Sequence, residues 1–493
     1  MEDLRNVGSS TQYPPHLEWE FLHSEQSIKN PELPEGVDLP GTPRLLKVTR
    51  DDQYSLKATI TGTIDKDRYS TEGTHSGRFI RPFEIKGAGW DGTYELSGCF
   101  INKTQCEFAN SPKFQENLDI WKILWTKENP GSHPSWLTEW YLNGYHSREI
   151  FNRHTIRLHT SEYTREREVY REPEQRFEAG RLRSNSLDYA YIQCPEFGFI
   201  VHEVPEGLGP AWSESIGIEY REEFGRIPDP LEREAVSEIV GFIMGKRLFN
   251  VGYSVYDEFG LPLELFAIKS WGDSITSLCK AAAFPPILFR VGTNKFETLL
   301  QDLVPKYLEM REPLDLDGAL LRYWIGGKSP LSTDVPIIAS GIEILAKAWF
   351  KSEGSKERRT YLPKKKFSAL IEEELASIAD KLGDNPNKDR ILRKIQSANN
   401  RGSGETVEDF FKKLGLNIGA AEKKAMSARN KMIHSRVTAS GQEQIKDLVR
   451  LSFAYRTLFH RVMLKLLGYS GKYLDYTAEG LPLPEKEVEE AAG

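Results

Sequence analysis

The stretch A-M-S-A-R-N-K-M-I-H-S-R, residues 425–436, decides how the C-terminal part of the chain is interpreted. Residues 420–432 are rich in Ala, Lys, Met and Glu, which are good helix formers. On a helix, Asn430 and His434 are four residues apart and share one face. Arg429 starts about 100° round the helix, but its side chain is long enough to reach the same place. The stretch therefore predicts a helix that presents an imidazole, an amide and a fixed cation together.

These three side chains are a candidate catalytic set for RNA cleavage. The imidazole of His434 titrates near neutrality, so it can donate or accept a proton. The guanidinium of Arg429 keeps its charge and binds phosphate through a planar fork, and the amide of Asn430 can orient either group. Such a set could cleave RNA without a metal ion: a base activates a ribose 2′-hydroxyl, which attacks its own phosphate, while cations stabilise the added negative charge.

The spacing of Arg429 and His434 is not specific by itself. At ordinary residue frequencies, an Arg followed five or six residues later by a His occurs about twice in a chain of this length. Residues 148–154 and 153–159 both contain this spacing, but neither Arg is followed by Asn and neither segment has helical periodicity. The alternative interpretation is a surface Arg followed by a histidine at a helix end.

Length and composition indicate a multidomain globular protein. The chain has 493 residues, enough for two or three domains. Its first ten residues have no basic region followed by an apolar one, so we expect no signal peptide, and no apolar run approaches the roughly 18 residues of a membrane span. The four cysteines are scattered and form no C-x-x-C pair. We therefore expect buried thiols in the reducing cytoplasm, with no metal, no cofactor and no membrane association.

Positive charge is concentrated around the candidate motif. Residues 388–436 contain 12 Lys and Arg against 5 Asp and Glu, a local net of +7, so the rest of the chain carries −14 to give the total of −7. Residues 351–366 are also basic, with 7 basic and 2 acidic side chains. Such basic patches attract a polyanionic substrate, although lysine-rich helix faces are also common as ordinary solvated surface. We expect Lys431, Arg436, Lys364, Lys365 and Lys366 to contact RNA.

Residues 1–290 are predicted to be rich in β-structure. Short β-branched and aromatic runs are separated by Gly, Pro, Asn and Asp clusters, a pattern that favours a sandwich or barrel-like sheet. One helix is expected after Asp229, which can cap it, and Pro230 suits its first position. The expected strands are residues 45–49, 55–63, 93–100, 118–126, 155–160, 188–202, 248–256 and 263–269.

From about residue 296 the pattern becomes helical, which makes the fold class α+β. Amphipathic spacing predicts a bundle over residues 296–475, and Pro305 should kink or split its first helix. Residues 476–493 are predicted to form a disordered acidic tail. The expected helices are residues 296–310, 316–324, 335–351, 364–382, 389–399, 406–414, 419–433 and 441–467.

The C-terminal third resembles a HEPN domain, an all-helical family with many metal-independent ribonucleases. The segment G-I-E-I-L-A-K-A-W-F (residues 341–350) resembles the first long helix of the family, and residues 399–416 resemble the connector before its motif helix. Residues 428–435, A-R-N-K-M-I-H-S, fit the family signature of Arg and His separated by four to six residues. The family usually has Gly after the His, where this chain has Ser435. A β-rich region followed by a HEPN domain also resembles ApeA-like anti-phage abortive-infection proteins.

The resemblance implies an endoribonuclease that acts as a homodimer or a higher homo-oligomer, in which two motif helices meet and form one composite site. Arg429 would contact the scissile phosphate, Asn430 would position His434 or the substrate, and His434 would transfer protons. Glu343 would orient Arg429 from the first long helix. The cleaved RNA, with tRNA as one candidate, would be attacked in the cytoplasm after a phage-derived trigger of unknown identity reaches residues 1–290.

Two other hypotheses stay open. Some HEPN domains bind RNA or nucleotides, or act as scaffolds, without catalysis. Alternatively, the β-rich region could bind carbohydrate or protein while the helical part only dimerises, which would leave Arg429 and His434 in separate cores.

Overall fold

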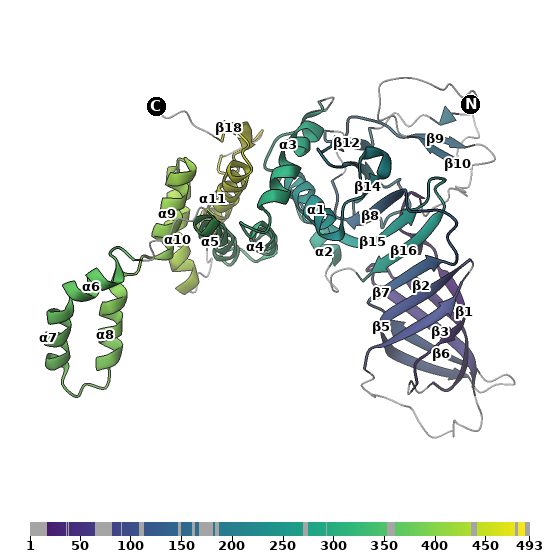
Figure 1. Ribbon diagram of the computed structural model, residues 1–493, viewed down its shortest axis with the longest axis horizontal. Coiled ribbons are helices and arrows are strands. Elements are labelled where there is room, and N and C mark those ends of the chain that lie inside the picture. Colours follow the sequence, from purple (N-terminus) through teal and green to yellow (C-terminus); the bar gives the residue numbers. More distant parts are fainter. Residues whose placement is uncertain are drawn as a thin grey trace. The chain divides into compact units, whose positions relative to one another are not determined.

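The computed structural model divides the chain into two compact units. One unit contains residues 1–285 and 289–305, and the other contains residues 286–288 and 306–493 (Figure 1). At residues 156–159, 163–166, 181–182, 403 and 430–434 only the backbone is described. The described residues are 17–488, except 36, 38, 65–80, 90, 108–112, 146–148, 160–162, 167–180, 183–186, 270–274, 292, 353–359, 435–440 and 479–481.

Six strands of the first unit close into a ring, visible at the lower right of Figure 1. The order is β4-β1-β2-β3-β6, and the long strand β5 pairs with both β4 and β6, so the sheet returns on itself. The predicted barrel-like sheet is therefore present. Its strands are β1 (Gln26–Glu32), β2 (Gly41–Arg50), β3 (Leu56–Ile64), β4 (Phe83–Ala88), β5 (Gly92–Glu107) and β6 (Lys113–Asp119).

The ring encloses an apolar core because its strands alternate between apolar and polar residues. In β3, Leu56, Ala58, Ile60, Gly62 and Ile64 are buried, while the alternate residues between them are partly exposed. Successive side chains of a strand point to opposite faces, so one face of β3 supplies the interior.

The remaining strands of this unit form an open antiparallel sheet that continues from β5 through β7. The order is β7-β16-β15-β8-β14-β13-β12, and a separate small sheet has the order β10-β9-β11. The strands are β7 (Lys122–Lys127), β8 (Trp136–Leu142), β9 (Ile156–His159), β10 (Tyr163–Glu166), β11 (Arg181–Leu182), β12 (Tyr189–Gln193), β13 (Gly198–Glu203), β14 (Ser215–Arg221), β15 (Phe249–Tyr256) and β16 (Pro262–Ile268).

Two predicted strands are each divided in the structure. Residues 118–126 were expected as one run, but β6 ends at Asp119 and β7 begins at Lys122. Residues 188–202 form the hairpin of β12 and β13, whose turn contains Pro195. Continuous apolar character does not reveal a turn when the turn residues are themselves apolar or lie between two buried strands.

A buried polar network ties the ring to the open sheet. The guanidinium of Arg50 in β2 forms an ion pair with Glu20, with Nε 2.8 Å from Oε1, and donates to the carbonyl of Val251 in β15 at 2.7 Å. Tyr54 donates to the same carboxylate at 2.8 Å and accepts from the indole N–H of Trp19 at 2.6 Å. Each buried charge and hydroxyl in this network therefore has a partner, as burial requires.

Helix α1 (Pro230–Met244) confirms the predicted start signal. The Asp229 side chain accepts from the N–H groups of Leu231 and Glu232, and the Glu232 side chain accepts from the Asp229 N–H at 2.9 Å. The spacing of Ala235, Ile239 and the neighbouring apolar residues predicts an apolar stripe along this helix, and these residues are buried. Arg233 on this helix pairs with Glu139 of β8 at 2.9 Å, which fixes α1 on the sheet.

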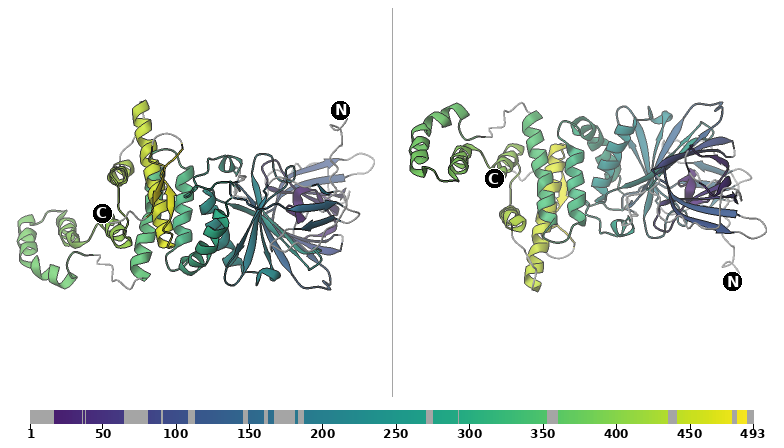
Figure 2. Two further views of the ribbon diagram at one scale, coloured as in Figure 1. Left: turned by 90° about the horizontal axis from the view of Figure 1, so that it is seen from above. Right: turned by 90° about the horizontal axis from the view of Figure 1, so that it is seen from below.

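The second unit is helical, as the periodicity predicts. Helix α5 packs against α4, α10 and α11, and Figure 2 shows α5 and α11 side by side. The α-helices, with α2 and the start of α3 belonging to the first unit, are α2 (Ile275–Cys279), α3 (Lys295–Met310), α4 (Leu316–Lys328), α5 (Asp334–Ser352), α6 (Lys364–Leu370), α7 (Glu372–Leu382), α8 (Lys388–Gln396), α9 (Ser403–Leu414), α10 (Ala420–His434) and α11 (Gln442–Leu466). The 3-10 turns are η2 (Phe21–His23), η3 (Glu222–Phe224) and η4 (Ser397–Asn399).

Four details of the helical unit differ from the sequence prediction. Helix α3 is not split at Pro305, although the division between the units falls at that residue. The helix expected over residues 364–382 breaks at Ile371, where α6 ends and α7 begins. Three- and four-residue spacing predicts that Ile445 belongs to the apolar stripe of α11, but Ile445 is 44% exposed, and its neighbours in the first turns of this helix are exposed too.

The fourth difference concerns the predicted disordered tail. Strand β18 (Glu485–Glu487) pairs with β17 (Lys472–Leu474), and Val488 is buried. Lys486 forms an ion pair with Asp475 at 2.6 Å. The acidic composition suggests disorder, but the segment also contains an apolar residue that is buried and a lysine that pairs with Asp475. These two contacts stabilise the short hairpin. The rest of the predicted tail, residues 479–481 and 489–493, lies outside the described residues.

Two further expectations concern cysteines and membranes. The four cysteines are free thiols; Cys99, Cys194 and Cys279 are buried, while Cys106 is partly exposed. No helix within the described parts of the chain has both the length and the apolar character needed to cross a membrane.

The cap of α1 gives a direct stability test. Replacing Asp229 by Ala removes the acceptor for two helix N–H groups, so we expect the free energy of unfolding of the first unit to fall by about 0.5–2 kcal/mol. Asp229→Asn keeps an acceptor oxygen and should lose much less. Thermal unfolding monitored by calorimetry measures both variants, and equal melting temperatures for Asp229→Ala and the natural protein would contradict the role of this cap.

Candidate functional site

The candidate motif lies on one continuous helix, α10, which spans Ala420–His434. Its N-terminus is fixed by Glu422, whose side chain accepts from the N–H of Gly419 at 2.8 Å. The same carboxylate pairs with Arg461 of α11, with Nη1 2.7 Å from Oε1, and both side chains are almost fully buried. Arg461 also donates to the carbonyl of Asn417 at 2.7 Å. The start of the motif helix is therefore fastened to α11.

Arg429 is held by Glu343, as the sequence resemblance led us to expect. Nη1 of Arg429 forms an ion pair with Oε1 of Glu343 on α5. Only 17% of the Arg429 side chain and 14% of the Glu343 side chain are exposed. Nε of Arg429 is buried and has no hydrogen-bond partner among the described residues. One edge of the guanidinium is thus anchored, while no described residue supplies an acceptor for Nε.

A small cavity of about 80 Å³ lies beside this pair. It is lined by residues of α5, α9, α10 and α11, including Arg429, Glu343 and Tyr455. Burial raises the pKa of the Tyr455 phenol above its usual value; the Arg429 guanidinium lowers it and the Glu343 carboxylate raises it. Tyr455 therefore stays a neutral hydroxyl in the electric field of both charges. From the sequence, the spacing of Tyr455 predicts only a place on the apolar stripe of α11.

The structure describes the other predicted site residues to different extents. Asn430, Lys431 and His434 belong to α10, where the structure describes their backbone only, and Arg436 lies outside the described residues. The lysines of the basic loop are exposed at the start of α6, and none of their ammonium groups makes a hydrogen bond or ion pair with a described residue; they are Lys364, Lys365 and Lys366. The structure thus brings Arg429 to Glu343, while the predicted RNA contacts remain predictions.

A second histidine, His460, was not singled out from the sequence. It is fully buried on α11, and its Nε2 lies 2.7 Å from the hydroxyl of Tyr323 on α4. Burial, helped by the charge of Arg456, lowers its pKa to about 3. His460 is therefore neutral at physiological pH and serves the packing of α4 and α11. Its position among the apolar residues of α11 could have indicated this role.

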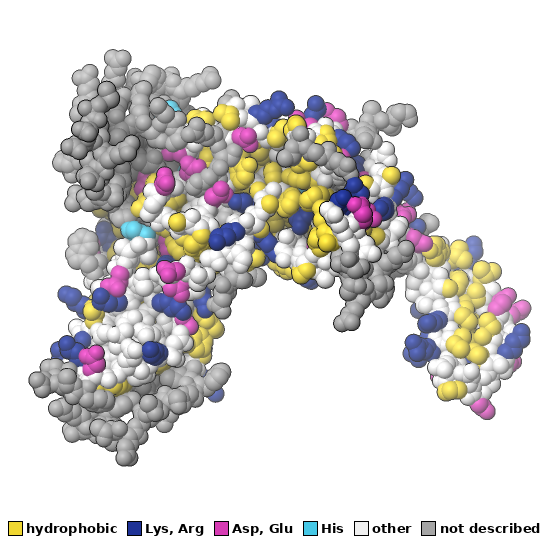
Figure 3. Space-filling view, turned by 180° about the vertical axis from the view of Figure 1, so that it is seen from behind, with side chains coloured by type: hydrophobic (Ala, Val, Ile, Leu, Met, Phe, Trp, Pro, Cys, Tyr) yellow, Lys and Arg dark blue, Asp and Glu magenta, His cyan; other side chains and the backbone are white. Residues whose placement is uncertain are grey.

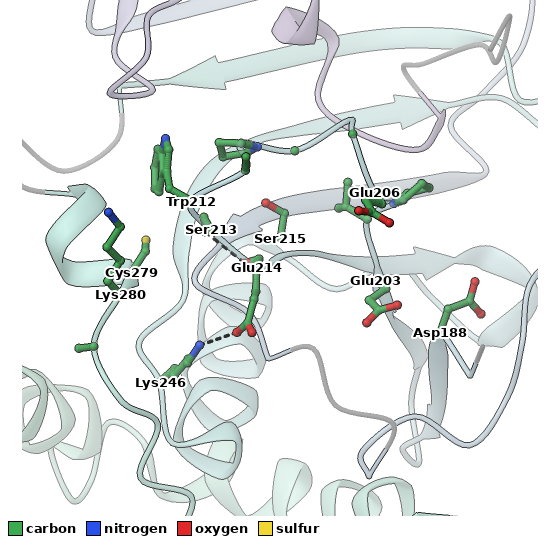
Figure 4. A pocket seen from close by; sticks show the side chains of 17 residues that line it. Asp188, Glu203, Glu206, Trp212, Ser213, Glu214, Ser215, Lys246, Cys279 and Lys280 are labelled. Atoms are coloured by element: carbon green, nitrogen blue, oxygen red, sulfur yellow. Dashed lines mark hydrogen bonds and ion pairs between the residues drawn. The ribbon is translucent and has the colours of Figure 1, made fainter. Parts of the chain in front are cut away.

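The first unit contains a larger cavity, of about 980 Å³, between the β13–β14 loop and the segment after α2 (Figure 4). Glu203, Glu206 and Trp212 lie around it in the close-up, and Lys246, two residues after α1, pairs with Glu214 on one wall. Its lining residues range from 188 to 281 in the sequence. No motif in the sequence indicates this cavity, because its residues come together only when the sheet forms.

Known proteins give no further guidance: no protein-family model, curated protein or solved structure matches the chain. Its function therefore has to be inferred from its own residues and their geometry.

The Arg429–Glu343 pair predicts strong energetic coupling. Removing one partner leaves a largely buried charge uncompensated, so we expect Glu343→Gln and Arg429→Met each to lower the free energy of unfolding of the helical unit by about 1–4 kcal/mol. The double variant should lose much less than the sum of the two. The exposed pair of Lys424 and Asp447, 3.5 Å apart, is the matched control and should show coupling of about 0.5 kcal/mol or less.

A double-mutant cycle by chemical or thermal unfolding measures these couplings. Additive losses for the Glu343 and Arg429 variants would show that the two charges do not interact in solution.

His460 predicts a pH dependence of stability. Its unfolded-state pKa is about 6.5, so between about pH 6.5 and pH 3 the unfolded chain binds a proton that the folded chain does not accept. This contribution to stability is complete above pH 6.5 and is lost as the pH falls toward 3. Between pH 7.5 and pH 5 the melting temperature of the natural protein should drop, and we expect this drop to be smaller in His460→Gln. In the control His154→Gln, whose side chain is exposed in the natural protein, the drop should equal that of the natural protein.

Proposed function

We propose that this chain is a HEPN-type endoribonuclease that cleaves RNA without a metal ion, and that the β-rich first unit controls it in anti-phage defence by abortive infection. The observation that carries the proposal is the state of Arg429. Glu343 holds one nitrogen of its guanidinium, and the buried Nε has no partner among the described residues. A buried donor without an acceptor costs free energy, which an incoming phosphate oxygen would recover.

The proposed chemistry assigns one task to each motif residue. His434 removes the proton from a ribose 2′-hydroxyl, and the oxygen attacks the adjacent phosphorus. The bond to the 5′-oxygen of the next nucleotide breaks, and that oxygen takes a proton from an acid, for which the His434 of a second copy is the candidate. Arg429 stabilises the negative charge on the phosphoryl oxygens, and Asn430 positions His434 or the substrate. The products are a 2′,3′-cyclic phosphate and a 5′-hydroxyl.

The proposal includes partners and location. Two copies would bring their α10 helices together into one composite site, as the resemblance to HEPN proteins implies. Lys431, Arg436 and Lys364 to Lys366 would bind the RNA backbone, for which tRNA is a candidate substrate. A phage-derived trigger would act on the first unit in the cytoplasm, and the 980 Å³ cavity is one concave feature that could receive it. No cofactor is required by this chemistry.

A non-catalytic RNA- or nucleotide-binding module or scaffold is the second candidate. The observation in its favour is that Glu343 already neutralises Arg429, because a compensated cation attracts phosphate less strongly. On this alternative, Arg429 would serve mainly to attach α10 to α5. RNA cleavage distinguishes the two candidates. A binding module would keep its RNA affinity when His434 is replaced, and neither the natural protein nor the variant would cleave RNA.

RNA cleavage in the presence of EDTA tests the proposal. Purified protein should cut total tRNA or mRNA in EDTA, and His434→Ala or Arg429→Ala should lower the rate by about 10²–10⁴-fold, because each removes a group that acts in the transition state. Lys424→Ala, an exposed change on the same helix, is the matched control and should keep the natural rate. Growth of cells producing each protein, with and without phage, should follow the same order.

The outcomes separate the two candidates. Equal cleavage by the natural protein and by both variants would place the nuclease activity elsewhere. RNA binding of equal affinity with no turnover in any form, even with phage components added, would support the binding module.

A further inference from the structure

The second unit contains a helical arm that buries none of its own helical residues. The arm consists of α6, α7 and α8, and within these three helices no residue is classed as buried. Leu370 is 64% exposed. Helices of 7, 11 and 9 residues are marginal by themselves in water and depend on packing of an apolar face. Such an arm therefore needs a surface to pack against.

The arm leaves and rejoins the rest of the unit at one point. Thr360 and Asn400 form an antiparallel bridge, and the buried Asn399 side chain exchanges two hydrogen bonds of 2.8 Å with the backbone of Leu362. Beside this base, the hydroxyl of Tyr361 donates to Glu405 of α9 at 2.6 Å. The base is thus well anchored, whereas the helices beyond it keep half-buried or exposed apolar side chains.

These apolar side chains form a continuous seam. Leu375, Ile378 and Leu382 are spaced by three and four residues along α7, and Ile391 and Ile395 by four along α8, so each helix has an apolar face. Figure 3 shows the resulting stripe of hydrophobic side chains along the arm, with basic and acidic side chains beside it. Two antiparallel amphipathic helices are half of a four-helix bundle.

The charges of the two helices identify the occupant of this face. Helix α7 has four acidic residues and one lysine, a net of −3, and α8 has four basic residues and one aspartate, a net of +3. No charged side chain of α7 or α8 forms an ion pair with a described residue. RNA is disfavoured as the occupant, because its phosphates would be repelled by the acidic α7 of the same hairpin. A second copy related by a two-fold axis would instead set α7 against α8 of its partner on both sides of the seam.

We propose that the α6–α8 arm joins two copies of this chain through an antiparallel four-helix bundle formed by α7 and α8 of each copy. The apolar seams supply the buried core, and the opposite charges of α7 and α8 set the antiparallel arrangement. This contact is independent of the proposed ribonuclease activity. If the protein cleaves no RNA, the contact between the arms can still be present. If the contact is absent, RNA cleavage still tests the chemistry proposed for α10.

A charge exchange in the full-length chain tests the arm. One variant reverses α7 (Glu372→Lys, Glu373→Lys and Glu374→Lys), and the other reverses α8 (Lys388→Glu, Arg390→Glu and Arg393→Glu). Each purified variant should associate with itself at least ten times more weakly than the natural protein, because like charges meet across the seam. A mixture of the two variants should recover association close to the natural affinity, since every facing pair is again of opposite sign.

The readout is co-purification of two differently tagged copies, with affinities from sedimentation. The matched control reverses three exposed carboxylates of the first unit, Glu35→Lys, Glu128→Lys and Glu258→Lys, and should associate like the natural protein. Recovery only in the mixture also shows that both variants fold. Self-association that is equal in all proteins, or absent from the natural protein, would overturn the proposal, as would two weakened variants whose mixture fails to recover.

Discussion

The candidate site depends on the ion pair between Arg429 and Glu343, because residues 420–429, the part of α10 with described side chains, bury little apolar surface. Among the described side chains of this helix, Ala425 is the one hydrophobic residue that is buried. Two largely buried charge pairs take the place of an apolar stripe: Glu422 with Arg461 near the start of α10, and Arg429 with Glu343 further along. Such pairs add little net stability, but they require a defined geometry. They therefore set the rotation of the helix that carries Asn430 and His434.

The same pair defines how the proposed site could work. A guanidinium has five N–H donors, and Glu343 occupies a single edge. The buried Nε and the neighbouring cavity leave room for a further acceptor beside Tyr455. A phosphate oxygen bound there would share the cation with Glu343 rather than displace it. Removal of Glu343 would then affect both the packing of α10 and the direction in which Arg429 points, which links stability and function at one residue.

Much of the fold could be predicted from the sequence, for reasons visible in particular elements. Helix α1 has a complete capping box, and α5 and α11 have strong apolar periodicity, so their existence and approximate ends were predicted correctly. The ring of strands required long-range pairing of β1 with β4 and of β3 with β6, which periodicity does not encode. The contact of Glu343 with Arg429 followed from the resemblance. The 980 Å³ cavity could not be predicted, because its lining is assembled from segments almost a hundred residues apart.

The chemistry of the RNA ends tests the central claim most directly. Attack by the ribose 2′-oxygen must leave a 2′,3′-cyclic phosphate, or the monophosphate formed from it, and a 5′-hydroxyl. Mass spectrometry of fragments produced by the purified protein, in a chelator and compared with His434→Ala, identifies both ends. The account predicts cyclic phosphate and 5′-hydroxyl ends that disappear in the variant. Fragments with 5′-phosphate and 3′-hydroxyl ends would contradict it, because water rather than the 2′-oxygen would then be the nucleophile.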